Sequence, residues 1–174
     1  DPDQRAKAQN LSAQQRRPPL HVAGYRMESF LGEGAFGEVW VAVKNNTNQR
    51  VAIKFCTRRR AEDWALLVRE VEKLAELSTD THVVKLLDTD ANSDLPYFVM
   101  EYLERGSLDD ELQANGTLPV DQALAIFRDT AQGIAHSHGK GILHCDLKPA
   151  NILLDQDGKP RICDFGQSRL SSEL

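Results

Sequence analysis

Ile142-Leu143-His144-Cys145-Asp146-Leu147-Lys148-Pro149-Ala150-Asn151, followed by Asp164-Phe165-Gly166, is the most informative part of this sequence. It sets polar groups of different chemistry at fixed offsets and then adds a second carboxylate. Asp146 can accept a proton from a hydroxyl, and Lys148 can neutralise a phosphate. Asn151 and Asp164 can offer the hard oxygen ligands that a magnesium ion prefers. The arrangement indicates a site that moves a phosphoryl group.

A glycine-rich segment lies upstream, Leu31-Gly32-Glu33-Gly34-Ala35-Phe36-Gly37-Glu38-Val39. Glycines between two strands let backbone amides approach the oxygens of a triphosphate, because no Cβ stands in the way. Alone the pattern is weak evidence, since an ordinary hairpin or a dinucleotide-binding turn can show it. A dinucleotide-binding turn is followed by a helix, whereas strand-like residues 38–43 follow here. That alternative is therefore disfavoured.

A carboxylate lies on the apolar side of the first predicted helix, residues 62–77. Apolar residues recur at helical spacing at positions 64, 67, 68, 71, 74 and 75. At about 100° per residue Glu70 falls inside this arc, and Glu72 falls outside it. A carboxylate in that position needs a buried cation. Lys54, at the end of the segment Val51-Ala52-Ile53-Lys54 in the predicted strand 50–55, is the expected partner. The alternative is a plain buried ion pair with no ligand.

Taken together, the glycine-rich segment, Lys54, the stretch around Asp146 and the segment Asp164-Phe165-Gly166 resemble the eukaryotic-type (Hanks-type) serine/threonine protein kinases. The spacing of the segments is similar to that of bacterial members. The resemblance covers residues 25–169 and implies an α+β, bilobal fold. It places a small lobe of five-stranded antiparallel sheet plus one helix at residues 23–101. A mainly helical, truncated large lobe is expected at residues 102–174, and residues 1–22 are expected to form a flexible lead-in.

The resemblance also implies roles for individual residues. Asp146 would act as the base, and Lys148 would lie beside the transferred phosphate. Lys54 would be held by Glu70 against the α- and β-phosphates. The implied cofactors are ATP and Mg²⁺. The implied substrate is a protein Ser or Thr hydroxyl, because serine/threonine kinases carry a lysine at the position of Lys148.

The implied ligand positions form two sets. The metal ligands would be Asn151 and Asp164. The nucleotide-binding positions besides Lys54 would be Leu31, Gly32, Glu33, Gly34, Ala35, Phe36 and Gly37 in the glycine-rich loop, Val39, Ala52 and Leu153 around adenine, Met100 as gatekeeper, and Glu101 and Leu103 in the hinge. Core packing explains the apolar members of this set equally well, and both interpretations can hold at once.

The rest of the pattern predicts short strands followed by helices. Strands are expected at residues 25–31, 38–43, 50–55, 83–88 and 97–101, with a short β-ribbon around 155–158. Helices are expected after Ser107 and over 120–138. The longer helix carries an apolar stripe at Leu124, Phe127, Ala131 and Ile134. Part of this stripe is expected to be exposed, because the later helices that cover it in relatives do not follow in this sequence.

Two departures from the family pattern bear on activity. Cys145 stands where most relatives have an arginine, so control by a phosphorylated activation loop is not expected. No Ala-Pro-Glu segment follows, and this chain alone is expected to be a poor phosphotransferase. The rival interpretation is a non-catalytic nucleotide-binding or scaffold module. The presence of Lys54, Asp146, Asn151 and Asp164 argues against it, since a scaffold has no chemical need for all four.

His144 is expected to be a packing residue, stacked with Phe165, Leu74 and Leu86, and not a proton shuttle. Small-molecule kinases of the aminoglycoside type share the H-x-D-x-x-x-x-N skeleton. Their hinge and glycine-rich loop resemble this sequence less, so they are the weaker match.

Composition restricts the class further. The 174 residues are 41% hydrophobic, which is enough for a sizeable core. The net charge of -5 gives no electrostatic case for nucleic acid, and no apolar run approaches the length of a membrane span. Cys56, Cys145 and Cys163 are too few and too scattered for a zinc site or a disulfide framework, which favours free thiols in a reducing compartment. A cytoplasmic location is expected, with a membrane anchor outside this segment left open.

Overall fold

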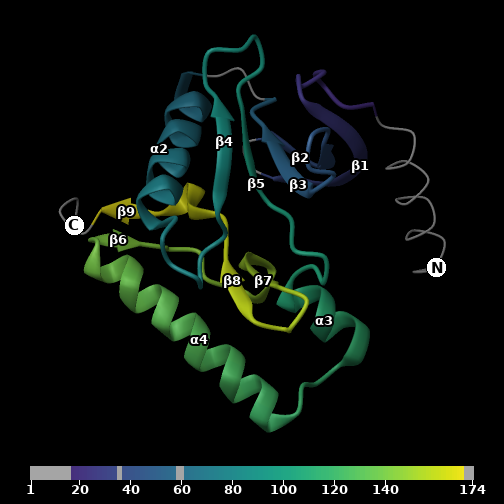
Figure 1. Cartoon of the computed structure of the whole chain (residues 1–174). Coiled ribbons are helices and arrows are strands. Elements are labelled where there is room, and N and C mark those ends of the chain that lie inside the picture. Colours follow the sequence, from purple (N-terminus) through teal and green to yellow (C-terminus); the bar gives the residue numbers. More distant parts are fainter. Residues whose placement is uncertain (1–16, 35–36, 58–60, 171–174) are drawn as a thin grey trace, which may run out of the picture. The chain divides into compact units, whose positions relative to one another are not determined.

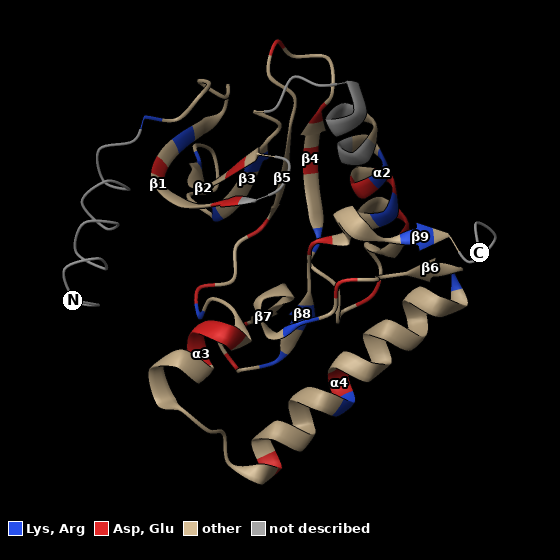
Figure 2. Ribbon diagram, turned by 180° about the vertical axis from the view of Figure 1, so that it is seen from behind, with Lys and Arg blue, Asp and Glu red and all other residues tan. Residues whose placement is uncertain are grey.

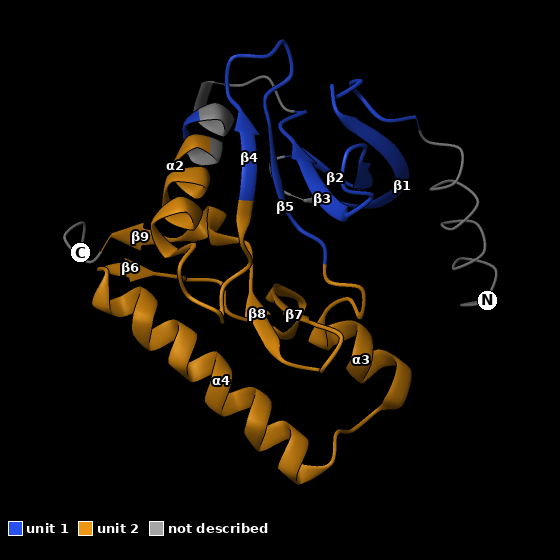
Figure 3. Ribbon diagram, viewed as in Figure 1, with its two compact units in different colours: residues 1–67, 87–102 blue, residues 68–86, 103–174 orange. Residues whose placement is uncertain are grey.

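The computed structural model describes residues 17–34, 37–57 and 61–170. Most of the expected lead-in, together with Ala35 and Phe36 of the glycine-rich loop, lies outside the described residues. The chain forms two compact units (Figure 3). The first comprises residues 1–67 and 87–102, and the second comprises residues 68–86 and 103–174.

The first unit is built on a five-stranded sheet with the order β1-β2-β3-β5-β4 (Figure 1). Its strands are β1 (Tyr25–Gly34), β2 (Gly37–Lys44), β3 (Arg50–Phe55), β4 (Leu86–Asp90) and β5 (Tyr97–Glu101). Antiparallel pairing joins β1 to β2, β2 to β3, and β3 to β5. The predicted five-stranded sheet accompanied by one helix is confirmed.

Valine, isoleucine and aromatic residues are frequent in β2 and in the central strand β3, and such side chains pack well on a pleated surface. Trp40, Ile53 and Phe55 are almost completely buried in its core. The edge of the Trp40 ring meets Phe30 at 5.4 Å between centroids, and its Nε1 donates to Glu38. Val22 is 1% exposed and belongs to the same core. Val22, the last residue of the expected lead-in, therefore packs with the sheet.

One predicted strand is displaced. The sequence pattern predicts a strand at residues 83–88, whereas β4 begins at Leu86. Val83 and Val84 are fully buried, but their backbone pairs with Ile162 of the second unit. The Val84 amide donates to the Ile162 carbonyl at 2.9 Å, and the Ile162 amide donates to the His82 carbonyl at 2.7 Å. The first residues of the predicted strand therefore pair with Ile162 and not with the five-stranded sheet.

The second unit combines helices with very short strands. Its elements are α3 (Leu108–Asn115), α4 (Val120–Gly139), β6 (Ile142–Leu143), η1 (Pro149–Asn151), β7 (Ile152–Leu154), β8 (Pro160–Ile162), η2 (Phe165–Gln167) and β9 (Arg169–Leu170). Helix α2 (Ala61–Leu77) begins in the first unit and contributes its residues from Val68 onward to the second. The pairs β6–β9 and β7–β8 are antiparallel ribbons. Helix α3 starts at a capping box in which Ser107 and Asp110 bond each other's backbone amides.

Helix α4 buries one face and exposes the other. Ile126, Thr130, Gly133 and Ser137 form the buried face. Phe127, by contrast, is 73% exposed, so the predicted exposure of part of the apolar stripe is confirmed within the described residues. Figure 2 shows that α4 carries few charges, whereas the first turn of α3 is acidic. The two helices line an apolar groove of about 600 Å³. None of the helices in the described part of the chain has the length and apolar character that crossing a bilayer requires.

Candidate active site

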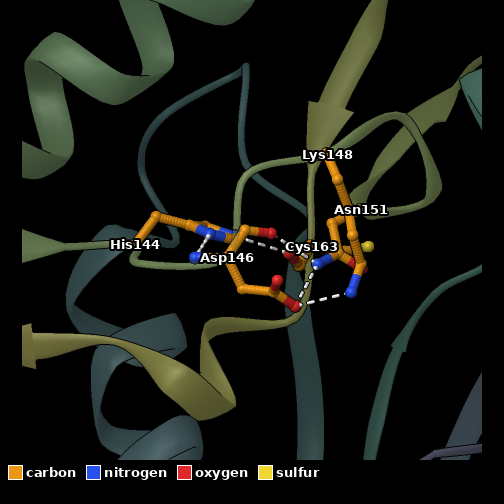
Figure 4. Close-up of polar contacts among 5 residues, drawn as sticks. All are labelled: His144, Asp146, Lys148, Asn151 and Cys163. Carbon is orange, nitrogen blue, oxygen red and sulfur yellow. Dashed lines mark hydrogen bonds and ion pairs between the residues drawn. The ribbon is translucent and has the colours of Figure 1, made fainter.

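The carboxylate of Asp146 is held by two donors from its own loop (Figure 4). Lys148 Nζ donates to Asp146 Oδ2 at 2.8 Å, and Asn151 Nδ2 donates to the same oxygen at 3.1 Å. Asn151 Nδ2 also donates to the Asp146 carbonyl at 2.8 Å. The structure therefore brings together three of the predicted site residues, and Asn151 fixes both the backbone and the side chain of Asp146.

The loop around Asp146 departs from regular structure at both ends. Ser137 Oγ of α4 donates to the Ile142 carbonyl at 2.6 Å and anchors β6, after which Cys145 turns the chain with a left-handed φ of 63°. Such a conformation is uncommon for a residue other than glycine. The Asn151 amide then closes the turn η1 on the Lys148 carbonyl at 2.9 Å. The loop thus presents Asp146 from a bend held by individual bonds.

His144 is 3% exposed and supports the loop through both ring nitrogens. Its Nδ1 accepts from the Asp146 amide at 3.3 Å, and its Nε2 lies 2.9 Å from the Cys163 carbonyl (Figure 4). A ring nitrogen that accepts a hydrogen bond leaves the other to donate, so Nε2 is the donor toward the Cys163 carbonyl. The ring meets Phe165 edge-on at 4.7 Å between centroids. The predicted packing of His144 on Phe165 is confirmed.

Electrostatics favour the ionised form of Asp146. The hydrogen bond from Lys148 holds the pKa of the Asp146 carboxyl below its ordinary value, with a further contribution from the Asn151 amide and partial opposition from desolvation. The same bond raises the pKa of Lys148, and the negative charge of Asp164 adds to that effect. Both side chains are therefore charged at neutral pH, as an acceptor for a substrate proton and its cationic neighbour require.

Asp164 and Asn151 have donor atoms that fit a magnesium ion. The amide nitrogen of Asn151 is engaged by Asp146, which leaves Oδ1 as its available metal ligand. Asp164 is half-buried and adopts a left-handed φ of 60° at the start of η2. The described residues contain no cluster of three or more His, Cys, Asp or Glu that could enclose a metal. Magnesium nevertheless binds through one or two carboxylates with substrate phosphates as further ligands, so this small donor set fits it.

The predicted nucleotide-binding residues of the first unit lie on adjacent strands. Val39 of β2 is opposite Lys54 of β3, and Ala52 is opposite Met100 of β5. Lys54 is 7% exposed, with Nζ 5.5 Å from the centroid of the Phe98 ring. This register confirms that the strands place the four residues next to one another. Their contact with a nucleotide stays a prediction.

The glycines of the loop between β1 and β2 differ in their surroundings. A Cβ on Gly37 would lie 1.8 Å from the Phe55 carbonyl oxygen, so the backbone of β3 leaves no room for a side chain there. A Cβ on Gly32 would meet nothing within 4 Å. Leu31 and Glu33 are exposed. Gly37 thus has a packing reason to be glycine, and Gly32 has none within the described residues.

The remaining predicted positions belong to other parts of the two units. Glu70 is 2% exposed on α2 in the second unit, and its pairing with Lys54 of the first stays a prediction. Glu101 ends β5, and Leu103 is buried immediately after the first unit ends. Leu153 lies in β7, where its backbone pairs with Ser107. All three cysteines are free thiols, as predicted, and Cys145 is exposed.

One residue of interest escaped the sequence analysis. Lys73 of α2 is 8% exposed, and its Nζ donates to the Ser168 carbonyl at 2.5 Å. A signal for it existed, because Lys73 lies on the same helical face as Glu70, Leu74 and Leu77, all of which are buried. A lysine in the buried arc of a helix requires a specific acceptor.

Comparison with known families matches residues 25–173 to the protein kinase domain. This match covers most of the chain, and it agrees with the sheet, the helix and the loop geometry described above. The chain belongs to the protein kinase family.

The curated relatives support the same assignment. Serine/threonine-protein kinase grp of Drosophila melanogaster is 31% identical over 149 residues, which is 86% of this chain and 29% of that protein. CBL-interacting serine/threonine-protein kinase 12 of Arabidopsis thaliana is 32% identical over 168 residues, or 95% of this chain and 34% of that protein. CBL-interacting protein kinase 21 of Oryza sativa subsp. japonica is 34% identical over 158 residues, which is 89% of this chain and 30% of that protein. The chain spans about a third of the length of these relatives.

Proposed function

We propose that this chain carries the nucleotide-binding and catalytic segments of a serine/threonine protein kinase, which transfers the γ-phosphoryl group of Mg-ATP to Ser or Thr hydroxyls of proteins. The observation that carries the proposal is the ionised Asp146 carboxylate held by Lys148 and Asn151. A pure scaffold has no use for a carboxylate fixed in this way. The names of the relatives, which are serine/threonine or protein kinases, point in the same direction.

The two oxygens of Asp146 have different tasks in this proposal. Oδ2 accepts both side-chain hydrogen bonds, from Lys148 and from Asn151. Oδ1 is then the oxygen that receives a proton from the substrate hydroxyl as the hydroxyl oxygen attacks phosphorus. The proton moves to Oδ1 and the former hydroxyl oxygen becomes the phosphoester oxygen. Lys148 offers a positive charge beside that group, because its pKa is raised and it stays protonated.

Bound Mg-ATP would supply the transferable phosphoryl group and a divalent charge that screens the phosphates. Asn151 Oδ1 and the Asp164 carboxylate would hold the ion. Lys54, buried at the end of the central strand β3, would offer its ammonium to the phosphates. Val39, Ala52 and the other apolar positions would enclose the adenine ring.

A transfer assay with γ-labelled ATP and a generic protein substrate tests this function. The assay is run on this chain and on the longest natural protein that contains it. The labelled protein substrate is then hydrolysed to identify which amino acid carries the label. Label on Ser or Thr that disappears in the Lys54→Met variant supports the proposal. Nucleotide binding by calorimetry without any transfer in the longer protein would instead identify a non-catalytic nucleotide-binding module.

A further inference from the structure

The buried ammonium of Lys73 connects α2 to the segment that follows Asp164, and both belong to the second unit. Lys73 Nζ donates to the Ser168 carbonyl at 2.5 Å, and the side chain is among the few buried charged groups of the described residues. Removing an ammonium from water is unfavourable unless hydrogen bonds replace its hydration. A bond from a charged donor to a carbonyl is among the stronger kinds of hydrogen bond. Lys73 is therefore directed at a particular backbone position.

Ser168 closes the short turn η2 (Phe165–Gln167). Its amide donates to the Phe165 carbonyl at 3.0 Å, and its hydroxyl donates to the same carbonyl. Phe165 itself is 1% exposed, with its ring against His144. The turn is thus fixed at its first residue by packing, and Lys73 holds Ser168, which follows its last residue.

The near end of the same turn is Asp164. This residue holds the left-handed backbone conformation at the start of η2, a conformation that needs support from its surroundings in a residue other than glycine. A three-residue turn held at its first residue by the packing of Phe165 and just beyond its last residue by Lys73 leaves little freedom to Asp164, the residue that precedes it. Lys73 and Asp164 thus lie at opposite ends of one short turn.

We propose that Lys73 is a positioning residue for Asp164: by holding the Ser168 carbonyl it keeps the turn η2 in the conformation that presents the Asp164 carboxylate to a magnesium ion. The role rests on the proposed function, since Asp164 needs its position only if the chain binds Mg-nucleotide. It also gives α2 a second task. Glu70 and Lys73 lie one turn apart on one face of the same helix, so a displacement of α2 moves the support of Asp164 together with Glu70.

The test compares nucleotide affinity with and without the metal. A non-hydrolysable ATP analogue is titrated into the 174-residue chain, once with excess Mg²⁺ and once with a chelator. Lys73→Met keeps the length of the side chain and removes its charge, and Lys159→Met, an exposed lysine of the same unit, is the matched control. Loss of a group that supports a metal ligand typically lowers metal affinity about 10–100-fold. Lys73→Met is expected to lose the Mg²⁺-dependent gain in affinity by that factor and to keep the metal-free affinity, while Lys159→Met changes neither.

Two further measurements separate positioning from a general structural role. Amide hydrogen exchange at residues 165–168 is expected to accelerate in Lys73→Met, and Lys73→Arg, which keeps the charge, is expected to recover part of the Mg²⁺ effect. An unchanged Mg²⁺ effect in folded Lys73→Met overturns the proposal, and so does an equal loss of affinity with and without Mg²⁺. If Lys73→Met does not fold, Lys73→Gln takes its place, with the same outcomes deciding.

Failure of the proposed function looks different. In that case the unchanged chain binds no nucleotide under either condition, whatever residue stands at position 73. Exchange at residues 165–168 still reports in that case whether Lys73 holds the turn.

Discussion

The sheet of the first unit and the catalytic segment of the second are built in opposite ways. The sheet has strands of 5 to 10 residues joined by extended backbone ladders, which are unbroken between β2 and β3 and between β3 and β5 and shift register twice between β1 and β2. The catalytic segment, residues 142–170, consists of strands of two or three residues and two single turns. Individual side chains fix its backbone: Ser137 on Ile142, His144 on Cys163, Asn151 on Asp146, and Lys73 on Ser168. The conformation of the sheet is determined by many similar residues together, whereas the conformation of the catalytic segment is determined by a few individual side chains.

This difference predicts different responses to substitution. In the sheet a lost side chain is one of many, so damage appears as lost stability. In the catalytic segment the loss of one polar group removes a specific geometry, so damage appears as lost activity in a protein that still folds. The following experiments test that separation.

The largest effect is expected for Asp146→Asn, which keeps the shape of the side chain and removes its basicity. Turnover is expected to fall about 10²–10⁴-fold, the usual contribution of a general base, with little change in nucleotide affinity. Steady-state kinetics in an active longer protein and calorimetry in the chain provide the two values. Asp157→Asn, an exposed carboxylate of the β7–β8 turn, is the control. Undiminished turnover in the variant, with contaminating kinases excluded, removes Asp146 from its role.

Helix α4 offers a matched pair of adjacent apolar residues. Ile126 is 5% exposed and Phe127 is 73% exposed. Ile126→Ala is expected to lower the free energy of unfolding by about 2–5 kcal/mol, the usual cost of deleting a buried aliphatic side chain. Phe127→Ala is expected to change it by no more than about 0.5 kcal/mol and to reduce self-association at high concentration. Urea denaturation and light scattering check both results. Similar losses of stability in the two variants would show that Phe127 is covered in solution.

Gly37→Ala tests how little space the sheet has at its glycine-rich end. The added Cβ must move away from the Phe55 carbonyl, and such overpacking typically costs about 1–3 kcal/mol. Gly32→Ala has open space and is expected to leave stability nearly unchanged. The measurement is the midpoint of urea denaturation for both variants. Equal midpoints would mean that the strands at Gly37 yield easily, which contradicts a rigid ladder.

The smallest effect concerns the pKa of the Asp146 carboxyl and is expected from the loss of Lys148 in Lys148→Met. Its ammonium holds the pKa of Asp146 below the ordinary value, so its removal is expected to raise that pKa. The acid limb of the activity profile then moves to higher pH. The lowered pKa stabilises the folded chain above the pKa of the unfolded carboxyl, and this contribution is lost as pH falls through the folded value. Because the Lys148 and Asp146 side chains are 53% and 33% exposed, water screens the pair and the shift is expected to be small.

An NMR titration of the Asp146 carboxyl measures this shift directly, and Lys140→Met, an exposed lysine after α4, serves as the control. A downward shift in Lys148→Met would contradict the assigned cause.

The same contrast explains what the sequence could predict. Alternating apolar residues predicted the strands of the sheet closely, with 50–55 and 97–101 identical to β3 and β5. The error at Val83 and Val84 arose because an apolar run indicates burial but does not indicate which segment its backbone pairs with. Here that segment contains Ile162. At the candidate site the motifs brought Asp146, Lys148 and Asn151 together as expected, since they lie within six residues of one another. The left-handed backbone of Cys145 and the reach of Lys73 to Ser168 depend on tertiary contacts, which no local pattern encodes.

Gly37 and Gly32 are expected to respond differently to mutation during evolution. Gly37 is closed to every side chain by the carbonyl of Phe55, so descendants of this chain would keep glycine there even after losing the ability to bind a nucleotide. Gly32 faces open space, and nothing in the described residues opposes a larger side chain at that position. If Gly32 contacts a nucleotide as the kinase resemblance implies, a larger residue at position 32 beside a retained glycine at position 37 would mark the loss of nucleotide binding, because packing alone explains the glycine at position 37.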